Sequence, residues 1–270
     1  MFNIERLKGS FESIYLIKMS ANDSFINMAA RFAPIPGTVI LMSGGNLDCA
    51  RYHILAAKPW LSLSGRGNSM NLSIDNEHHE FEADPFDTLR MVLNHYDIDV
   101  KDLYPDFSIP VLSGLFGYLS YDLKDNFEQL PRTSLDDLGL PHLCLFAPSI
   151  VLIHDKAENS TFLCIPERRV SGRNFQDDSL KFFNEIISSN LPERGVYSGG
   201  AEGFRSNFIK TDYMQSIEKI REYIASGHVY QVNMSQRFDM DFEGDPFSLF
   251  ETLYMRNPAP FFAFIQAGDH

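Results

Sequence analysis

Short apolar runs separated by tight turns dominate the first two hundred residues. The runs are rich in β-branched and aromatic residues and short enough for strands, and Gly65-Arg66-Gly67-Asn68 marks one of the turns. Consecutive short strands joined by tight turns pair with their sequence neighbours, which predicts an antiparallel meander. The expected strands cover residues 12–18, 38–42, 52–57, 60–64, 70–74, 111–123, 143–154 and 162–166.

Apolar residues at helical spacing predict five helices among these strands. Cap-type residues or Asp-Pro pairs precede several of them, as at Asp84-Pro85 and Asp245-Pro246, and Gly227 follows another. The expected helices begin at Asp23, Asp84, Phe175, Thr211 and Asp245. Two further strands are expected at residues 229–238 and 260–265. The predicted fold class is α+β, with an antiparallel sheet in the N-terminal domain and helices flanking it.

Residues 191–206 form the one convincing linker, because this stretch is rich in glycine and has no clear hydrophobic period. We therefore predict two domains, an N-terminal one over residues 1–205 and the beginning of another over residues 206–270. Asp-Pro-Phe occurs at Asp84 and again at Asp245, but the flanking residues differ, so it is interpreted as repeated helix-start chemistry and not as an internal repeat.

Composition narrows the class of protein and its surroundings. The formal net charge of −13 and the pI near 5.0 disfavour nucleic acid and anionic membranes as partners. Three widely spaced cysteines suggest neither a disulfide framework nor a metal site, which favours a reducing compartment. The N-terminus lacks a signal-peptide pattern, and no apolar run reaches the roughly 20 residues of a membrane span. A cytoplasmic protein is expected.

Three stretches of the sequence resemble a known family. Residues 226–238 (SGHVYQVNMSQRF) and 257–264 (NPAPFFAF) resemble the opening of the chorismate-binding domain of aminodeoxychorismate synthase component I and anthranilate synthase component I. Residues 117–123 (GYLSYDL), with Phe127-Glu128 and Leu130-Pro131 after them, resemble a pattern of the family's N-terminal domain. YQVN at 230–233 and PFFAF at 260–264 favour the aminodeoxychorismate branch over the anthranilate branch.

The resemblance implies a transferase that aminates chorismate to 4-amino-4-deoxychorismate for p-aminobenzoate and folate biosynthesis. It implies ammonia from a glutaminase (glutamine amidotransferase) partner and Mg²⁺ as cofactor. Two alternatives stay open. One is anthranilate synthase component I of tryptophan biosynthesis, and the other is a non-catalytic module that binds an amino acid.

The resemblance also implies a pocket for tryptophan. Aromatic walls bury an indole face, while hydroxyl and amide groups meet the carboxylate and ammonium of the amino acid. At two of the matching positions, Cys49 and Ala50 stand where the family often has Tyr-Ser or Ser-Ser, which removes possible hydrogen bonds. The matching residues are Ser43, Cys49, Ala50, Arg51, Tyr52, Tyr230, Asn233, Pro260, Phe261 and Phe262.

No catalytic residue and no metal ligand is assigned in this chain. The family's Ser-x-Pro-Glu and Pro-Ile-Lys-Gly-Thr motifs, which supply its acid–base glutamate and nucleophilic lysine, do not occur in the sequence. We therefore expect a truncated sequence that is inactive alone. The histidines offer no alternative chemistry, because His78-His79 is expected at a solvated hairpin tip and His142, His154 and His228 are isolated along the chain.

Overall fold

The computed structural model describes residues 10–20, 23–75, 77–95, 109–131, 135–170 and 172–270. Contacts divide the chain into two compact units. The first unit combines Met1–Pro192 with Glu251–His270, and the second is Glu193–Phe250. The division predicted at residues 205 and 206 falls inside the second unit.

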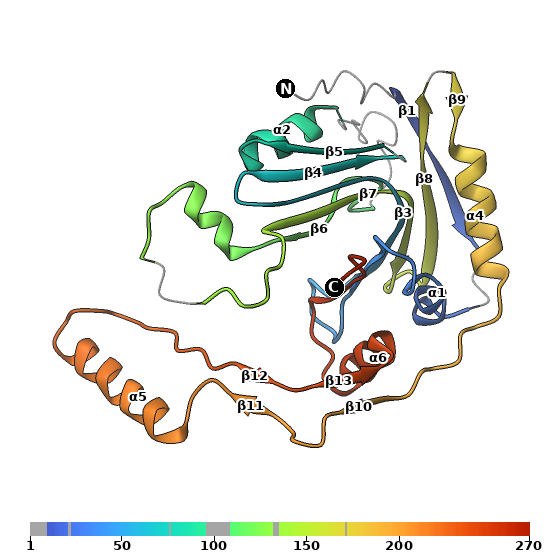
Figure 1. Ribbon diagram of the computed structural model, residues 1–270. Helices are drawn as coiled ribbons and strands as arrows, with labels where there is room; N and C mark the ends of the chain where they lie inside the picture. Colours follow the sequence, from blue (N-terminus) through green and yellow to red (C-terminus); the bar gives the residue numbers. More distant parts are fainter. Residues whose placement is uncertain (1–9, 21–22, 76, 96–108, 132–134, 171) are drawn as a thin grey trace. The chain divides into compact units, whose positions relative to one another are not determined.

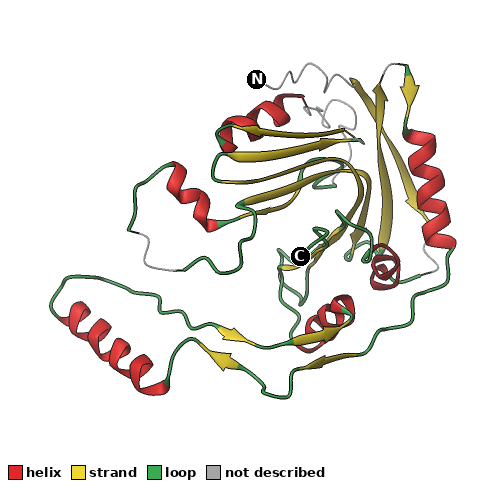
Figure 2. Ribbon diagram, in the orientation of Figure 1, coloured by secondary structure: helices red, strands yellow, loops and turns green. Residues whose placement is uncertain are grey.

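One antiparallel sheet is the centre of the first unit (Figures 1 and 2). Its main path runs in the order β1 (Ser10–Met19), β8 (Ser160–Val170), β7 (Leu143–Asp155), β3 (Tyr52–Arg66), β2 (Val39–Met42) and β14 (Phe262–Ile265). Four strands branch from this path, namely β4 (Ser69–Ile74), β5 (Glu77–Glu82), β6 (Phe116–Leu119) and β9 (Arg173–Asn174). The predicted antiparallel α+β fold is confirmed.

Strand β3 is one long strand where the sequence predicted two. Lys58 has a φ of 53°, and the register with β7 shifts between Pro59 and Leu61. A bulge of this kind bends a strand without ending it, and proline is tolerated there because its missing N–H leaves no ladder bond broken. The gap between the strands predicted over residues 52–57 and 60–64 is therefore a bend at Lys58-Pro59, and β3 pairs with β7 on both sides of it.

Strand β5 replaces the expected hairpin tip at His78-His79. The tight turn comes earlier, because Asp75 adopts a φ of 52° and Ile74 pairs directly with Glu77. Asx residues tolerate this left-handed conformation and so permit a short hairpin. His78 and His79 consequently lie within a strand opposite Ser73 and Leu72. Charged residues on such an edge strand discourage pairing with other chains.

The helices of the first unit begin close to where the sequence predicts. Helix α1 (Phe25–Phe32) is capped by Ser24 and not by Asp23, whose carboxylate instead accepts from Arg31. Asp84 caps α2 (Pro85–His95) by accepting from the backbone N–H of Phe86. Helix α4 (Gln176–Ser188) packs against α1, where the Phe32 and Phe183 rings stack with centroids 6.1 Å apart.

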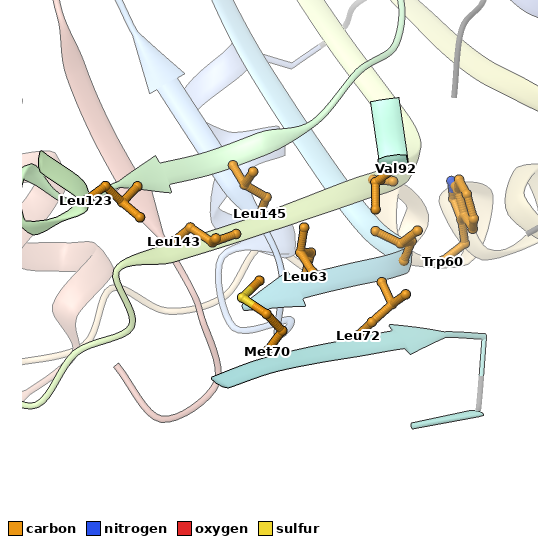
Figure 3. Close-up of a cluster of buried hydrophobic side chains, with 10 residues drawn as sticks. Trp60, Leu63, Met70, Leu72, Val92, Leu123, Leu143 and Leu145 are labelled. Atoms are coloured by element: carbon orange, nitrogen blue, oxygen red, sulfur yellow. The ribbon is translucent and has the colours of Figure 1, made fainter. Parts of the chain in front are cut away.

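Two clusters of buried side chains belong to the core of the first unit among the described residues. One gathers residues of β3, β4 and β7 with Val92 of α2 and Leu123 of the 3₁₀ helix η2 (Tyr121–Asn126) (Figure 3). The other gathers residues of β1, β2, β3, β6, β7 and β8, among them Ile14, Val39 and Val151. The paired strands β3 and β7 contribute to both clusters, so close packing holds this pair on both faces.

The second unit has little regular sheet. β10 (Tyr197–Gly199) pairs with β13 (Phe242–Gly244), and β11 (Arg205–Ser206) pairs with β12 (Phe238–Asp239). The strand predicted over residues 229–238 is wrong, because only its last residue pairs and 229–237 are irregular. Strand-forming residues without a partner strand leave their backbone groups unpaired and do not form sheet.

The helices of this part of the chain match their predicted positions. Helix α5 (Lys210–Ala225) has no buried residue, and α6 (Pro246–Arg256) crosses the division between the units. Among the described helices, none combines the length and the hydropathy that a membrane crossing requires.

Candidate functional site

The predicted pocket residues of the first unit are concentrated in the connection between β2 and β3. We call residues Ser43–Tyr52 the pocket segment. Ala50 is buried, Cys49 is exposed, and Ser43, Arg51 and Tyr52 are half-buried. The segment has no helix and contributes only Tyr52 to a strand. Its conformation therefore depends on contacts with its surroundings.

A buried imidazole holds the beginning of the pocket segment. The backbone N–H of Ser43 donates to Nδ1 of His53, 3.1 Å away. The His53 ring stacks on His154 at 5.8 Å and lies 5.3 Å from the ring of Phe25. Burial, followed by the charges of Lys156 and His154, lowers the pKa of His53 to about 4. His53 is thus a neutral acceptor at neutral pH.

A bidentate ion pair holds the end of the pocket segment. Nε of Arg51 lies 3.1 Å from each carboxylate oxygen of Asp155, and Nη2 lies 2.6 Å from Oδ2. Hydrogen bonds from Arg51 hold the pKa of Asp155 below its usual range. The guanidinium also lies over the ring of Tyr52, with 4.9 Å between its central carbon and the ring centroid. Arg51 is therefore fixed in orientation.

Residues 258–262, near the C-terminal end of the first unit, lie beside the pocket segment, and we call them the wall. Gly44 donates its N–H to the carbonyl of Ala259 at 2.7 Å. A Cβ on Gly44 would lie 2.6 Å from Cβ of Pro258, so the approach of the two backbones requires glycine. Strand β14 pairs Phe262 with Met42 and so continues this contact along β2.

Tyr254 of α6 joins the wall to the segment. Its hydroxyl donates to the carbonyl of Ser43 at 3.3 Å, and its ring packs edge-on against Phe262 at 5.6 Å. Tyr254 thus links Ser43 to Phe262, two of the predicted pocket residues. Phe261 is 80% exposed and has no ring partner among the described residues, and Pro260 before it is half-buried.

Two predicted residues, Tyr230 and Asn233, belong to the second unit. Tyr230 is 95% exposed, and the side-chain oxygen of Asn233 accepts from Gln231 at 3.2 Å. Both lie in the irregular stretch between α5 and β12. Their place in a common pocket with the pocket segment stays a prediction.

Two polar groups in the pocket segment are available to a ligand. Within the described part of the chain, the hydroxyl of Ser43 and Nη1 of Arg51 have no hydrogen-bond partner, whereas the other guanidinium donors face Asp155. A hydroxyl and a fixed cationic donor beside aromatic rings suit a small carboxylate with an apolar body.

One group of side chains among the described residues has the composition of a metal site. Ligand atoms of Asp122, Asp136 and His142 lie within 4.8 Å of one another. Lys124 pairs with Asp122 at 3.1 Å and Arg66 pairs with Asp136, while the backbone N–H of Gly67 donates to Nδ1 of His142. These carboxylates are already neutralised, so the group does not fit a divalent cation.

Sequence reasoning missed three residues that shape the site, namely His53, Lys156 and Tyr254. The only available signal was position, because Lys156 directly follows the strand β7 that pairs with β3. His154, expected to be isolated, in fact stacks on His53 and shares a hydrogen bond with Thr161 at 3.0 Å.

Comparison with known proteins places this fold in a family. The model of the chorismate binding enzyme family matches residues 50–270. The chain belongs to this family. Anthranilate synthase component I from Streptococcus pneumoniae is similar in structure, with a TM-score of 0.59 and 20% identity over 79% of this chain and 47% of that chain. This likeness supports the chorismate-binding family fold.

Curated relatives in this chorismate binding family carry two different names. "Anthranilate synthase component 1" of Cereibacter sphaeroides is 30% identical over 84% of this chain and 47% of its own length. "Aminodeoxychorismate synthase component 1" of Bacillus subtilis is 27% identical over 92% of this chain and 52% of its own length. The chain spans about half the length of these relatives.

Proposed function

We propose that the chain is the N-terminal portion of an aminodeoxychorismate synthase component I. The whole protein would aminate chorismate to 4-amino-4-deoxychorismate, with ammonia from a glutamine amidotransferase and with Mg²⁺. The observation that carries the proposal is the family match over residues 50–270, which includes YQVN at 230–233 and PFFAF at 260–264. The aminodeoxychorismate synthase of Bacillus subtilis aligns with 92% of this chain, which agrees with it.

Anthranilate synthase component I is the second candidate. It is supported by the relative from Cereibacter sphaeroides, whose identity of 30% slightly exceeds the 27% of the Bacillus subtilis relative. The two reactions share chorismate and ammonia and differ in product. The product made by the whole protein therefore distinguishes them.

The one metal-like group of side chains among the described residues does not fit the proposed Mg²⁺. This group, at Asp122, Asp136 and His142, is occupied by Arg66, Lys124 and a backbone N–H. We therefore derive no catalytic step through the metal, and we assign this chain an architectural and ligand-binding role. By this proposal the 270-residue chain alone does not turn over chorismate.

The ligand-binding role belongs to the pocket segment and the wall beside it. We propose that the pocket takes tryptophan or a similar amino acid. Nη1 of Arg51 would donate to the carboxylate, the Ser43 hydroxyl would contact a polar group, and Tyr254 with Phe262 would contact the apolar side chain.

The reaction is tested on the whole protein, expressed from its gene, with chorismate, Mg²⁺ and ammonium. We expect loss of chorismate that depends on ammonium, and a product that aminodeoxychorismate lyase converts to p-aminobenzoate. Direct appearance of fluorescent anthranilate would establish the second candidate instead. The 270-residue chain, assayed in parallel, is expected to leave chorismate unchanged, and turnover by it would refute the assignment of a non-catalytic portion.

The pocket is tested on the 270-residue chain by thermal unfolding with L-tryptophan. A ligand at one hundred times its Kd stabilises the native state by about 2.7 kcal/mol, so Tm should rise by a few degrees. Arg51→Ala should abolish the rise, while Arg90→Ala, which removes an exposed guanidinium from α2, should preserve it. If Tm is unchanged at millimolar tryptophan and no tryptophan copurifies, the proposed ligand is wrong.

A further inference from the structure

The turn after β7 makes several hydrogen bonds to the pocket segment. From this geometry we propose that Lys156, together with Asp155, is a positioning residue that preorganises the pocket segment for its ligand. The inference rests on the proposed function in one respect, namely that the pocket segment binds an amino acid. Its structural half, the ordering of residues 43–50 by Lys156, does not depend on that ligand.

The ammonium of Lys156 is saturated by backbone carbonyls. Nζ donates to the oxygen of Ser43 at 2.8 Å, of Gly45 at 3.1 Å and of Ala50 at 2.7 Å. An ammonium has three protons and accepts none, so three carbonyls occupy its full capacity. Lys156 therefore has no donor left for a carboxylate ligand, which separates a positioning role from a role in direct contact.

The three carbonyls come from both ends of the irregular stretch. Ser43 and Gly45 lie where the chain leaves β2, and Ala50 lies just before it enters β3. One cation thus closes a loop that has no helix and no strand between residues 43 and 51. Charge-assisted bonds are stronger than neutral ones, and three of them converge on one atom.

Asp155 fixes Arg51, near the end of the pocket segment. Its carboxylate accepts from Arg51, and Oδ1 also accepts from the backbone N–H of Ala157 at 2.9 Å and of Glu158 at 3.3 Å. The carboxylate is itself fixed by the turn, so the guanidinium of Arg51 is held with Nε and Nη2 on Asp155. The backbone N–H of Lys156 adds a bond to the carbonyl of Arg51 at 3.0 Å.

The base of this arrangement is rigid. Asp155 is the last residue of β7, which pairs with β3 on one side and with β8 on the other. Tyr52 of β3 lies directly opposite Asp155 in the register. A ligand that meets a segment already ordered from this base avoids the entropic cost of ordering it on binding.

Lys156→Met is the first test, because it keeps the apolar stem and removes all three donors. We expect amide hydrogen exchange over residues 44–50 to accelerate at least tenfold while exchange in the middle of β3 and β7 is unchanged. We also expect the Kd for L-tryptophan, measured by calorimetry, to rise at least tenfold. Lys181→Met, which removes an exposed lysine of α4 whose carboxylate neighbour Glu185 is 4.0 Å away, should change neither.

Asp155→Asn provides the second variant, and it keeps the proposal testable if Lys156→Met does not fold. It retains an oxygen for the turn but weakens the hold on Arg51. We expect tryptophan binding to weaken while exchange over residues 44–50 stays slow, because Lys156 is still present. If Asp155 and Lys156 only stabilised the fold, each variant would change both the amide exchange over residues 44–50 and Tm. Binding and exchange would then not respond separately to the two variants.

The outcomes distinguish the inference from the proposed function. If the unchanged chain binds tryptophan and Lys156→Met binds it with the same Kd, the positioning role is refuted. If exchange over residues 44–50 is unaffected by Lys156→Met, the ordering role is refuted whatever the ligand. If the unchanged chain binds no tryptophan but the variant shows faster exchange, the proposed ligand fails and the ordering role stands.

Discussion

His53 shows how one side chain connects burial to the shape of the site. Its Nδ1 accepts from Ser43, so the ring must stay unprotonated at that nitrogen for the pocket segment to keep its first anchor. The ring is enclosed by Phe25, His154 and Tyr254, with the charge of Lys156 nearby. Burial and this positive charge both oppose protonation, which is why its pKa falls to about 4.

The lowered pKa of His53 predicts a specific dependence of stability on pH. The unfolded chain binds a proton at this residue near pH 6.5, whereas the folded chain does so only near pH 4. Between these values the unfolded state holds more protons, so the free energy of unfolding falls as pH falls. The full difference is at most about 3 kcal/mol, and less because water still screens part of the ring. Burial lowers the pKa of His154 as well and adds in the same direction.

Urea unfolding of the wild-type chain and of His53→Gln at pH 7, 6, 5 and 4.5 measures this slope. The glutamine oxygen keeps an acceptor for Ser43 and does not titrate, so the variant should lose less stability between pH 7 and 4.5, by about 1–2 kcal/mol. His78→Gln, which removes an imidazole from the exposed strand β5, serves as the control. Equal slopes for the wild type and His53→Gln would contradict the prediction.

Strand β6 depends on one glycine, Gly117, whose backbone lies close to that of β7. A Cβ on Gly117 would lie 2.0 Å from the carbonyl oxygen of Cys144 on β7, and its φ is 146°. Neither feature is compatible with a side chain.

Gly117→Ala should therefore detach β6 from β7 and lower the free energy of unfolding by roughly 2–4 kcal/mol. Gly114→Ala is a matched control, because Gly114 has a φ of 145° but nothing within 4 Å of its Cβ position. Gly114→Ala should lower the free energy of unfolding only by the backbone strain at this φ, about 1–2 kcal/mol. Urea unfolding of both variants measures the difference, and equal losses would show that contact with Cys144 is not what requires glycine.

Local pattern predicted most elements of the sheet but not how long they run. Alternation and apolar runs located β2, β3, β4, β7 and β8 because the residues that face the core are repeated along each strand. Pattern alone split β3 at Pro59, since a bulge and a break have the same local sequence. The pattern also predicted a strand over residues 229–238 that the structure does not contain. The strand-forming residues there have no partner strand, and the presence of a partner depends on tertiary structure.

The candidate site was predictable only in part, for a different reason. Resemblance led to Ser43, Arg51, Tyr52 and Phe262, and the structure gathers these residues of the first unit around Tyr254 and Asp155. Lys156 was not found, because it recognises backbone carbonyls, and a carbonyl is present at every residue whatever the sequence. Contacts of this kind depend on how the chain is folded, so the spacing of residue types along the sequence does not predict them.

At the scale of the whole chain, burial differs sharply between the two units. The first unit contains two hydrophobic core clusters and the ten-stranded sheet among the described residues. In the second, α5 has no buried residue, and the paired strands are two or three residues long. A helix of this length and such short ribbons are marginally stable without packing. Local opening should therefore begin in residues 193–250.

Limited proteolysis of the native chain tests this difference. Among the described residues, trypsin should cut first within 193–250, at exposed sites of α5 such as Lys219 and Arg221, while β3 and β7 stay intact. The fragment that ends at His270 should remain bound after cleavage, because β14 pairs with β2 and Gly44 bonds to Ala259. Gel filtration followed by mass spectrometry should find this fragment eluting with the first unit, and 6 M urea should release it. First cuts within the sheet, or a free C-terminal fragment without urea, would show that β14 is not a stable part of the first unit.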